Sequence, residues 1–121
     1  MEDTVSSRTI VAAVNDLMFG SRIRDAALRA GVSAVFVRTA ADLLERAATA
    51  DLVLLDLEAR WLDAPAAISA LKGATQTARV PVIVFGAHVD VDALKAARDA
   101  GADRVLARSA FVKLLPELLR G

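Results

Sequence analysis

Two acidic positions in this sequence each follow an apolar run, and together they could bind a cation. Asp56 follows four consecutive apolar residues in the segment 51–58. The run 9–14 ends in the same way, in Asn15 and Asp16. Because an ionisable group is costly to bury, we expect both acids to lie where their strands emerge into a crevice. If the two strands are neighbours, Asp16 and Asp56 share that crevice and form an acidic site.

Five apolar runs, which alternate with stretches at helical spacing, are expected to be the strands that position these residues. The runs are 9–14, 33–37, 52–57, 82–85 and 104–107. Strands that are apolar on both faces are typical of a parallel sheet covered by helices. Five strand–helix units with short connections most often adopt the order 2-1-3-4-5. The sequence therefore predicts an α/β fold: a flavodoxin-like three-layer sandwich with a five-stranded parallel sheet and helices on both faces.

Capping residues predict where the helices begin and end. The expected helices are 15–31, 39–49, 63–73, 90–100 and a fifth that starts after Ser109. Thr39 and Asp63 are suitable N-caps, and Gly31 suits the left-handed position after a helix. Pro116 is expected to kink or shorten the fifth helix because proline has no N–H to donate.

Composition and length exclude several classes of protein. The 121 residues are enough for one domain, which we place at 9–121 after a short flexible tail at 1–8. Fifteen basic and fifteen acidic residues give no net charge, so no nucleic-acid partner is expected. The chain has no cysteine and therefore no disulfide or thiolate metal site. The absence of cysteine also fits a cytoplasmic protein. No apolar stretch approaches the ~18 residues of a membrane span, so we expect no membrane contact.

Four short motifs, in order along the chain, resemble those of response-regulator receiver domains. They are Val-Asn-Asp at 14–16, Leu-Leu-Asp at 54–56, Val-Pro-Val-Ile-Val at 80–84 and Ala-Gly-Ala-Asp at 100–103. The resemblance covers nearly the whole chain. It implies a stand-alone, non-enzymatic protein of two-component phosphorelay signalling. Its partners would be a histidine kinase or phosphotransfer protein and a downstream protein, and a homodimer could form through the fourth helix, fifth strand and fifth helix.

The resemblance also implies a site. Asp56 occupies the phosphoacceptor position, and Asp16, Asp56 and the backbone carbonyl of Glu58 would hold Mg²⁺. Asn15 replaces the first of the family's two metal-binding acids, which lowers the negative charge and weakens the attraction for a metal. The expected cofactor is therefore Mg²⁺ at a weakened site.

Several other positions that line the site depart from the family pattern. Gly86 replaces the hydroxyl-bearing residue after the fourth strand, although the small Ala87 that follows is as expected. Arg108 replaces the lysine that ends the fifth strand in the family, and Ser109 replaces the proline that follows it. Val105 lies near the place of the family's aromatic switch residue. Arg108 keeps the positive charge, and we expect it to pair with Asp56 or Asp16 in the unmodified protein.

These observations leave three functions open. The first is a receiver that is phosphorylated on Asp56 with Mg²⁺ and acts by protein–protein interaction. The second is a pseudo-receiver that binds its partners without phosphorylation, as Gly86 and Arg108 suggest. The third is a flavodoxin-like small-molecule binder or enzyme, which is disfavoured because the segment after the first strand lacks a glycine-rich phosphate loop. Leu17 and Met18, which follow Asp16, could belong to the core or to a partner-docking patch, and their apolar character favours the core.

Overall fold

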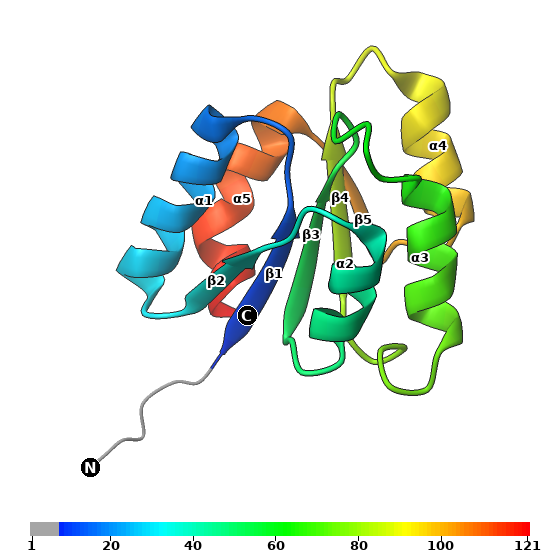
Figure 1. Ribbon diagram of the computed structural model, residues 1–121. Coiled ribbons are helices and arrows are strands. Elements are labelled where there is room, and N and C mark those ends of the chain that lie inside the picture. Colours follow the sequence, from blue (N-terminus) through cyan, green and yellow to red (C-terminus); the bar gives the residue numbers. More distant parts are fainter. Residues whose placement is uncertain (1–7) are drawn as a thin grey trace.

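The computed structural model describes residues 8–121, which form five strands and five helices (Figure 1). The strands are β1 (Thr9–Ala13), β2 (Ser33–Phe36), β3 (Leu52–Asp56), β4 (Val82–Gly86) and β5 (Arg104–Ala107). All pairings are parallel and the order is β2-β1-β3-β4-β5, which confirms the predicted sheet. Residues 1–7 lie outside the described part of the chain, so the flexible tail expected at 1–8 stays a prediction. Arg8 is described, and its Nε donates to the carbonyl of Leu119 at 2.6 Å.

The helices cover both faces of the sheet. They are α1 (Leu17–Ala30), α2 (Ala40–Ala47), α3 (Ala64–Gly73), α4 (Val91–Asp99) and α5 (Arg108–Arg120). Helices α1 and α5 lie on one face, and α2, α3 and α4 lie on the other (Figure 1). Two apolar cores result, because alternate residues of each strand point to opposite faces. Ile10 and Leu54 belong to the core under α1 and α5, whereas Val11 and Leu55 belong to the other.

Side-chain caps fix the starts of three helices, and two of them, at Thr39 and Asp63, were predicted from the sequence. The carboxylate of Asp16 accepts from the N–H of Phe19 at 2.7 Å, and Thr39 and Asp63 cap α2 and α3 in the same way. Gly31 ends α1 with φ of 72°, a conformation that glycine adopts without a steric penalty. The caps place the start of α1 directly beside the carboxyl end of β1.

The fifth helix differs from the prediction at both ends. It begins at Arg108, directly after β5, instead of after Ser109, and it continues through Pro116 to Arg120. Of the two effects expected of Pro116, a kink or a shorter helix, the shortening does not occur. Leu115 and Leu119 are buried on either side of Pro116, so packing against the sheet holds the helix across the missing hydrogen bond. The immediate start matters for the site, because it brings Arg108 to the edge of the sheet.

Candidate functional site

Asp56 is the last residue of β3 and lies buried at the carboxyl edge of the sheet. Its side chain is surrounded by protein, with 1% of the residue exposed. β1 pairs with β3, and Ala13 lies opposite Leu55, so the Asn15–Asp16 segment emerges at the same edge. The predicted adjacency of the first and third strands is therefore present.

Three hydrogen-bond donors hold the carboxylate of Asp56. The backbone N–H of Asn15 donates to Oδ2 at 3.2 Å, and the backbone N–H of Glu58 donates to Oδ1 at 2.9 Å. The guanidinium Nη2 of Arg108 also donates to Oδ1, at 2.9 Å. Arg108 is therefore the charge partner of Asp56, which was one of the two partners predicted for it. The pair compensates a carboxylate that would be costly to bury alone.

Arg108 is itself held on several sides. Its Nη2 lies 3.6 Å from Oε1 of Glu58, a second carboxylate. The Cζ atom of its guanidinium lies 4.6 Å from the centroid of the Phe19 ring, which gives a cation–π contact. Phe19 in turn stacks on Phe85, with ring centroids 5.0 Å apart. The guanidinium is thus packed between two carboxylates and an aromatic ring that belongs to the core.

Asp16 makes its contacts separately from Asp56. Its Oδ1 caps α1 by accepting from the N–H of Phe19. Together with Asn15 it lines a cavity of about 460 Å³, and Asp56 is not among the residues that line this cavity. The two acids therefore lie at one edge of the sheet, but Asp16 caps α1 whereas Asp56 pairs with Arg108.

The space beside Gly86 is filled by Leu57. A Cβ atom built on Gly86 would lie 2.9 Å from Cδ1 and 3.2 Å from Cβ of Leu57, both closer than ordinary contact. Gly86 is the buried end of β4 and pairs with Ala107 of β5, so its backbone has little freedom to move away. Ala87 follows and is half-buried. A serine or threonine at position 86 would therefore require Leu57 to change its position.

The site does not fit a Mg²⁺ ion while Arg108 is in this position. Among residues 8–121, no three carboxylate or imidazole side chains are grouped closely enough to hold a metal ion. The predicted set of Asp16, Asp56 and the backbone carbonyl of Glu58 contains only two carboxylates, and the guanidinium lies 2.9 Å from Oδ1 of Asp56. Mg²⁺ would compete with Arg108 for Oδ1 of Asp56, because both cations would bind that oxygen.

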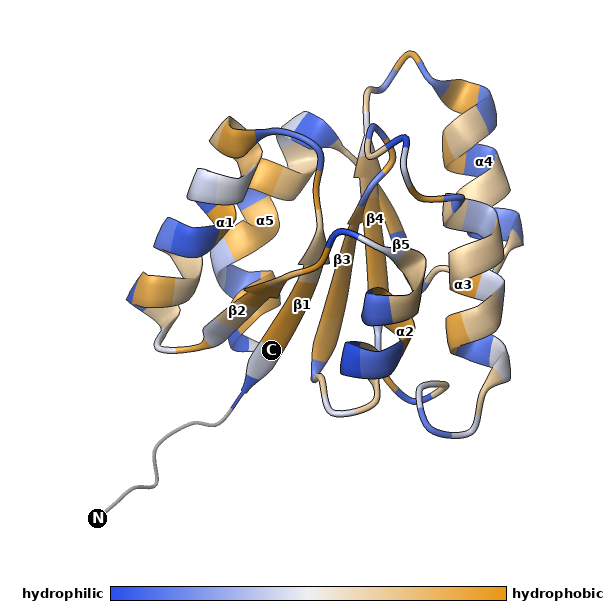
Figure 2. Ribbon diagram, in the orientation of Figure 1, coloured by the Kyte–Doolittle hydropathy of each residue, from blue (hydrophilic) through white to orange (hydrophobic). Residues whose placement is uncertain are grey.

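Two residues that the sequence places in the core are in fact exposed. Leu17 is 86% exposed and Met18 is 75% exposed, both on the first turn of α1. The prediction from their apolar character is wrong because the cap at Asp16 turns this side of the helix away from the sheet, and Phe19 takes the inward position instead. Val89, in the loop before α4, and Val91, its first residue, are also exposed. Figure 2 shows hydrophobic ribbon at the starts of both α1 and α4.

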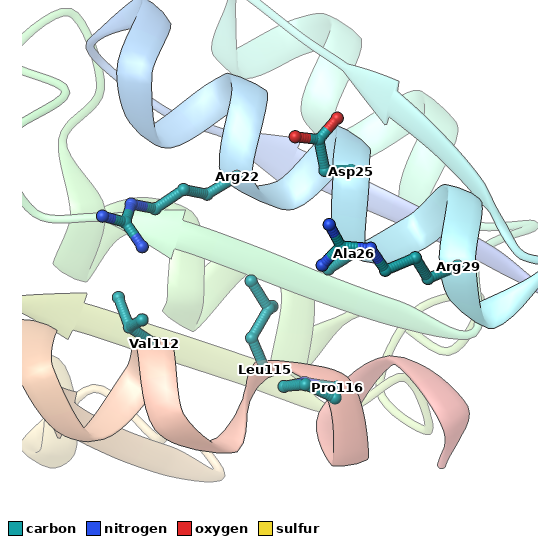
Figure 3. Close-up of a pocket in the computed structure, with 7 residues that line it drawn as sticks. All are labelled: Arg22, Asp25, Ala26, Arg29, Val112, Leu115 and Pro116. Atoms are coloured by element: carbon teal, nitrogen blue, oxygen red, sulfur yellow. The ribbon is translucent and has the colours of Figure 1, made fainter.

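A second groove lies away from this edge, between α1 and α5. It has a volume of about 310 Å³, and Figure 3 shows Arg22 and Arg29 of α1 beside apolar side chains of α5. The apolar side is made by Val112, Leu115 and Pro116. No residue of the Asp56 site lines this groove.

Sequence reasoning missed three parts of the Asp56 site. The stacking of Arg108 on Phe19, the contact with the Glu58 side chain and the occupation of the Gly86 space by Leu57 all depend on side-chain positions in three dimensions. One signal was present: Phe19 lies three residues after Asp16, which places it on the inward side of the first helical turn.

No protein-family model matches the sequence, and no curated protein matches it, but many solved structures share its fold. The chain is similar to a putative response regulator from Chloroflexus aurantiacus, with a TM-score of 0.82, 17% identity, and 95% of this chain and 96% of that chain covered. It is also similar to the receiver domain of a sensor histidine kinase from Pseudomonas aeruginosa, whose active-site cleft holds a magnesium ion. That comparison has a TM-score of 0.77 and 17% identity, and covers 96% of this chain and 100% of that one.

A third similar structure is the phosphorylated response regulator of a cyanobacterial phytochrome, with a TM-score of 0.76, 19% identity, and 96% and 91% of the two chains covered. At these identities the likeness establishes the fold. The chain has the fold of response-regulator receiver domains. No helix within residues 8–121 is both long and apolar enough to cross a membrane.

Proposed function

We propose that this chain is an atypical receiver that acts in two-component signalling through protein contacts, without being phosphorylated. The observation that carries the proposal is the ion pair of 2.9 Å between Arg108 and the buried carboxylate of Asp56. In this proposal the protein's own guanidinium supplies the positive charge that a metal ion would otherwise supply. The protein is then not an enzyme, and its crevice is held in one state.

The chemistry of phosphoryl transfer supports the proposal. Transfer to a carboxylate depends on positioning and on neutralising the charge of the phosphoryl oxygens. Gly86 has no hydroxyl to bond such an oxygen, and Leu57 occupies the space that a larger residue would need. The carboxylate of Asp56 already accepts three hydrogen bonds. An incoming phosphoryl group would have to displace Arg108 and would gain no donor from position 86.

Exposed apolar side chains support a role in protein contacts. Leu17 and Met18 follow β1, and Val89 and Val91 follow β4, the two strands that flank β3 in the sheet; all four are exposed. Apolar groups gathered at one edge are typical of protein–protein surfaces. The proposed partners remain a histidine kinase or phosphotransfer protein and a downstream protein. By analogy with the fold, the surface of α4, β5 and α5 is a second candidate, for a partner or for a second copy of the chain.

A second function, phosphorylation of Asp56, is favoured by the position of that residue at the end of β3. The side chain of Arg108 is 27% exposed, so it has a route out of the crevice. If it left, Asp16, Asp56 and the backbone carbonyl of Glu58 would be the residues to hold Mg²⁺, which would supply charge neutralisation. One similar structure holds magnesium in its cleft and another is phosphorylated.

Intact-mass measurement distinguishes the two functions. The purified chain is incubated with acetyl phosphate and Mg²⁺, beside a receiver that is known to accept phosphate from this donor. Our proposal predicts that the control gains one phosphoryl group and this chain gains none. A phosphoryl adduct on the native chain that Asp56→Asn abolishes would establish the second function. The Arg108→Ala variant shows which barrier matters, since an adduct in this variant alone would identify the ion pair as the barrier.

A further inference from the structure

The cavity of about 460 Å³ beside Asp16 has the size of a small-molecule site. It lies between the start of α1, the end of β2 and the loop from β3 to α3. Ligand sites in folds of this class lie at this edge of the sheet. The lining residues that bear on its chemistry are Asn15, Asp16, Arg24, Phe36, Arg38 and Trp61.

The cavity carries two guanidinium groups that have no anionic partner. Within residues 8–121, neither Arg24 nor Arg38 makes a hydrogen bond or an ion pair with the protein. Among the described residues, Asp16 is the only carboxylate that lines the cavity, and its Oδ1 is used to cap α1. The guanidinium of Arg24 lies over the ring of Phe36, with Cζ 4.6 Å from the ring centroid, which orients it. Two such groups suit a phosphate, since the planar fork of arginine matches phosphate oxygens.

The same cavity offers an aromatic face. Trp61 is 40% exposed and, in the described part of the chain, makes no ring contact with another aromatic or basic side chain. An indole face of this kind stacks on a planar ring. Asn15 lines the cavity with polar groups, and the second carboxylate oxygen of Asp16 can accept from an amino or imino group. Cations, an aromatic face and hydrogen-bonding groups thus surround one space.

We infer that this cavity binds a nucleoside monophosphate. Arg24 and Arg38 hold the phosphate, Trp61 stacks on the base, and Asp16 and Asn15 bond its polar edge. The phosphate is held by side chains and does not need the glycine-rich loop that the sequence lacks. The groove between α1 and α5 also has two arginines, Arg22 and Arg29, but no aromatic ring lines it, so it does not offer the same combination (Figure 3). This site is separate from Asp56 and does not depend on the function proposed for it.

Trp61 provides a direct readout, because it is the only tryptophan and the chain has no tyrosine. Titration of the purified chain with each of the four common nucleoside monophosphates should change its fluorescence saturably, with a Kd of about 0.1 mM or tighter for at least one of them. Calorimetric titration checks the same Kd without an optical signal. Inorganic phosphate alone and the matching nucleoside alone should each bind at least about tenfold more weakly, because each makes only part of the contacts.

Matched arginine variants, with two controls on α1, locate the site. Arg24→Ala and Arg38→Ala should each weaken binding about tenfold or more, whereas Arg22→Ala and Arg29→Ala should leave it unchanged. By calorimetry, Trp61→Ala should weaken binding and Trp61→Phe should largely restore it, since Phe keeps an aromatic face. Circular dichroism of each variant confirms that the fold is intact.

Three results would overturn the inference. The first is no saturable binding of any of the four nucleotides at millimolar concentration. The second is binding that Arg22→Ala or Arg29→Ala weakens as much as Arg24→Ala does, which would place the ligand in the groove between α1 and α5. The third is equal affinity for the nucleoside without its phosphate, which would remove the role of the two guanidinium groups.

Discussion

At the scale of single residues, the site is organised around a guanidinium in contact with a buried carboxylate. Arg108 reaches Asp56 because α5 starts directly after β5, and the ring of Phe19 fixes the guanidinium from another side. A buried ion pair gains little over an apolar pair of the same shape, but losing one partner is costly because the other charge stays buried. The ion pair therefore holds Arg108 against Asp56 but adds little to the free energy of unfolding compared with an apolar pair.

This asymmetry predicts the effect of removing Arg108. Arg108→Ala should lower the free energy of unfolding by roughly 3 kcal/mol, because it leaves the buried charge of Asp56 without its ion-pair partner. We expect the low end of the usual range, since two backbone N–H groups still donate to Asp56. Urea unfolding measures the change. Arg108→Lys should cost less, since it keeps the charge and removes a buried Nε that has no acceptor among the described residues. Arg104→Ala, at an exposed position of β5, is the control, and equal stability of the Arg108→Ala and native proteins would contradict the prediction.

The packing of Leu57 against Gly86 gives a second prediction. Gly86→Ser should lower the free energy of unfolding by about 1–3 kcal/mol, because the new Cβ meets Leu57 at 2.9 Å. In a Leu57→Ala background the same substitution should cost about 1 kcal/mol less, because the contact with Cδ1 at 2.9 Å is removed and only the contact with Cβ remains. A double-mutant cycle from chemical denaturation measures this coupling. An identical cost of Gly86→Ser in both backgrounds would show that Leu57 does not limit this position.

At the scale of elements, the start of α1 explains why Asp16 is present whether or not it binds a metal. Its carboxylate accepts from the N–H of Phe19 and thereby orients the first turn that carries Leu17 and Met18 outward. Phe19 faces inward from the same turn and supports Arg108. One cap therefore positions both the exposed apolar residues and the aromatic ring of the site.

Capping and metal binding by Asp16 can be separated by a conservative substitution. Asp16→Ala should lower the free energy of unfolding by about 1 kcal/mol, whereas Asp16→Asn should change it by only a few tenths, because Asn caps helices as well as Asp does. Thermal unfolding without metal measures both. If Asp16→Asn were as destabilising as Asp16→Ala, the negative charge and not the cap would be what matters at this position.

At the scale of the whole molecule, the sheet divides two apolar cores and its middle is protected on all sides. β1, β3 and β4 have a bonded neighbour on each side, whereas β2 and β5 are at the edges and are only half-buried. Hydrogen exchange followed by NMR should therefore find the slowest amides in β1, β3 and β4. Faster exchange is expected in β2 and β5. Protection of the edge strands equal to that of β3 would contradict this order of local stability.

The sequence predicts the arrangement of the sheet well because the apolar runs and caps are local signals. The five runs, the caps at Thr39 and Asp63 and the adjacency of the first and third strands are all found in the structure. The packing around the site was not predictable in this way. Exposure of Leu17 and the fit of Leu57 against Gly86 depend on the angle at which helices and loops leave the sheet, and no local pattern encodes that angle.

The pairing of Arg108 with Asp56 is an intermediate case. Its two charges were visible in the sequence, and the sheet order brings their strand ends toward one edge. The sequence did not determine whether Arg108 pairs with Asp16 or with Asp56. It pairs with Asp56 because Asp16 caps α1 and because the Phe19 ring lies beneath the guanidinium.

The most direct test of the account is a crystal structure of the native chain grown with Mg²⁺ and beryllofluoride, a mimic of the phosphoryl group. We predict that Nη2 of Arg108 stays in hydrogen-bond contact with Oδ1 of Asp56, as in the contact of 2.9 Å seen here, and that neither additive binds there. Magnesium and beryllofluoride bound at Asp56, with Arg108 displaced into solvent, would contradict the account and establish a phosphorylatable receiver.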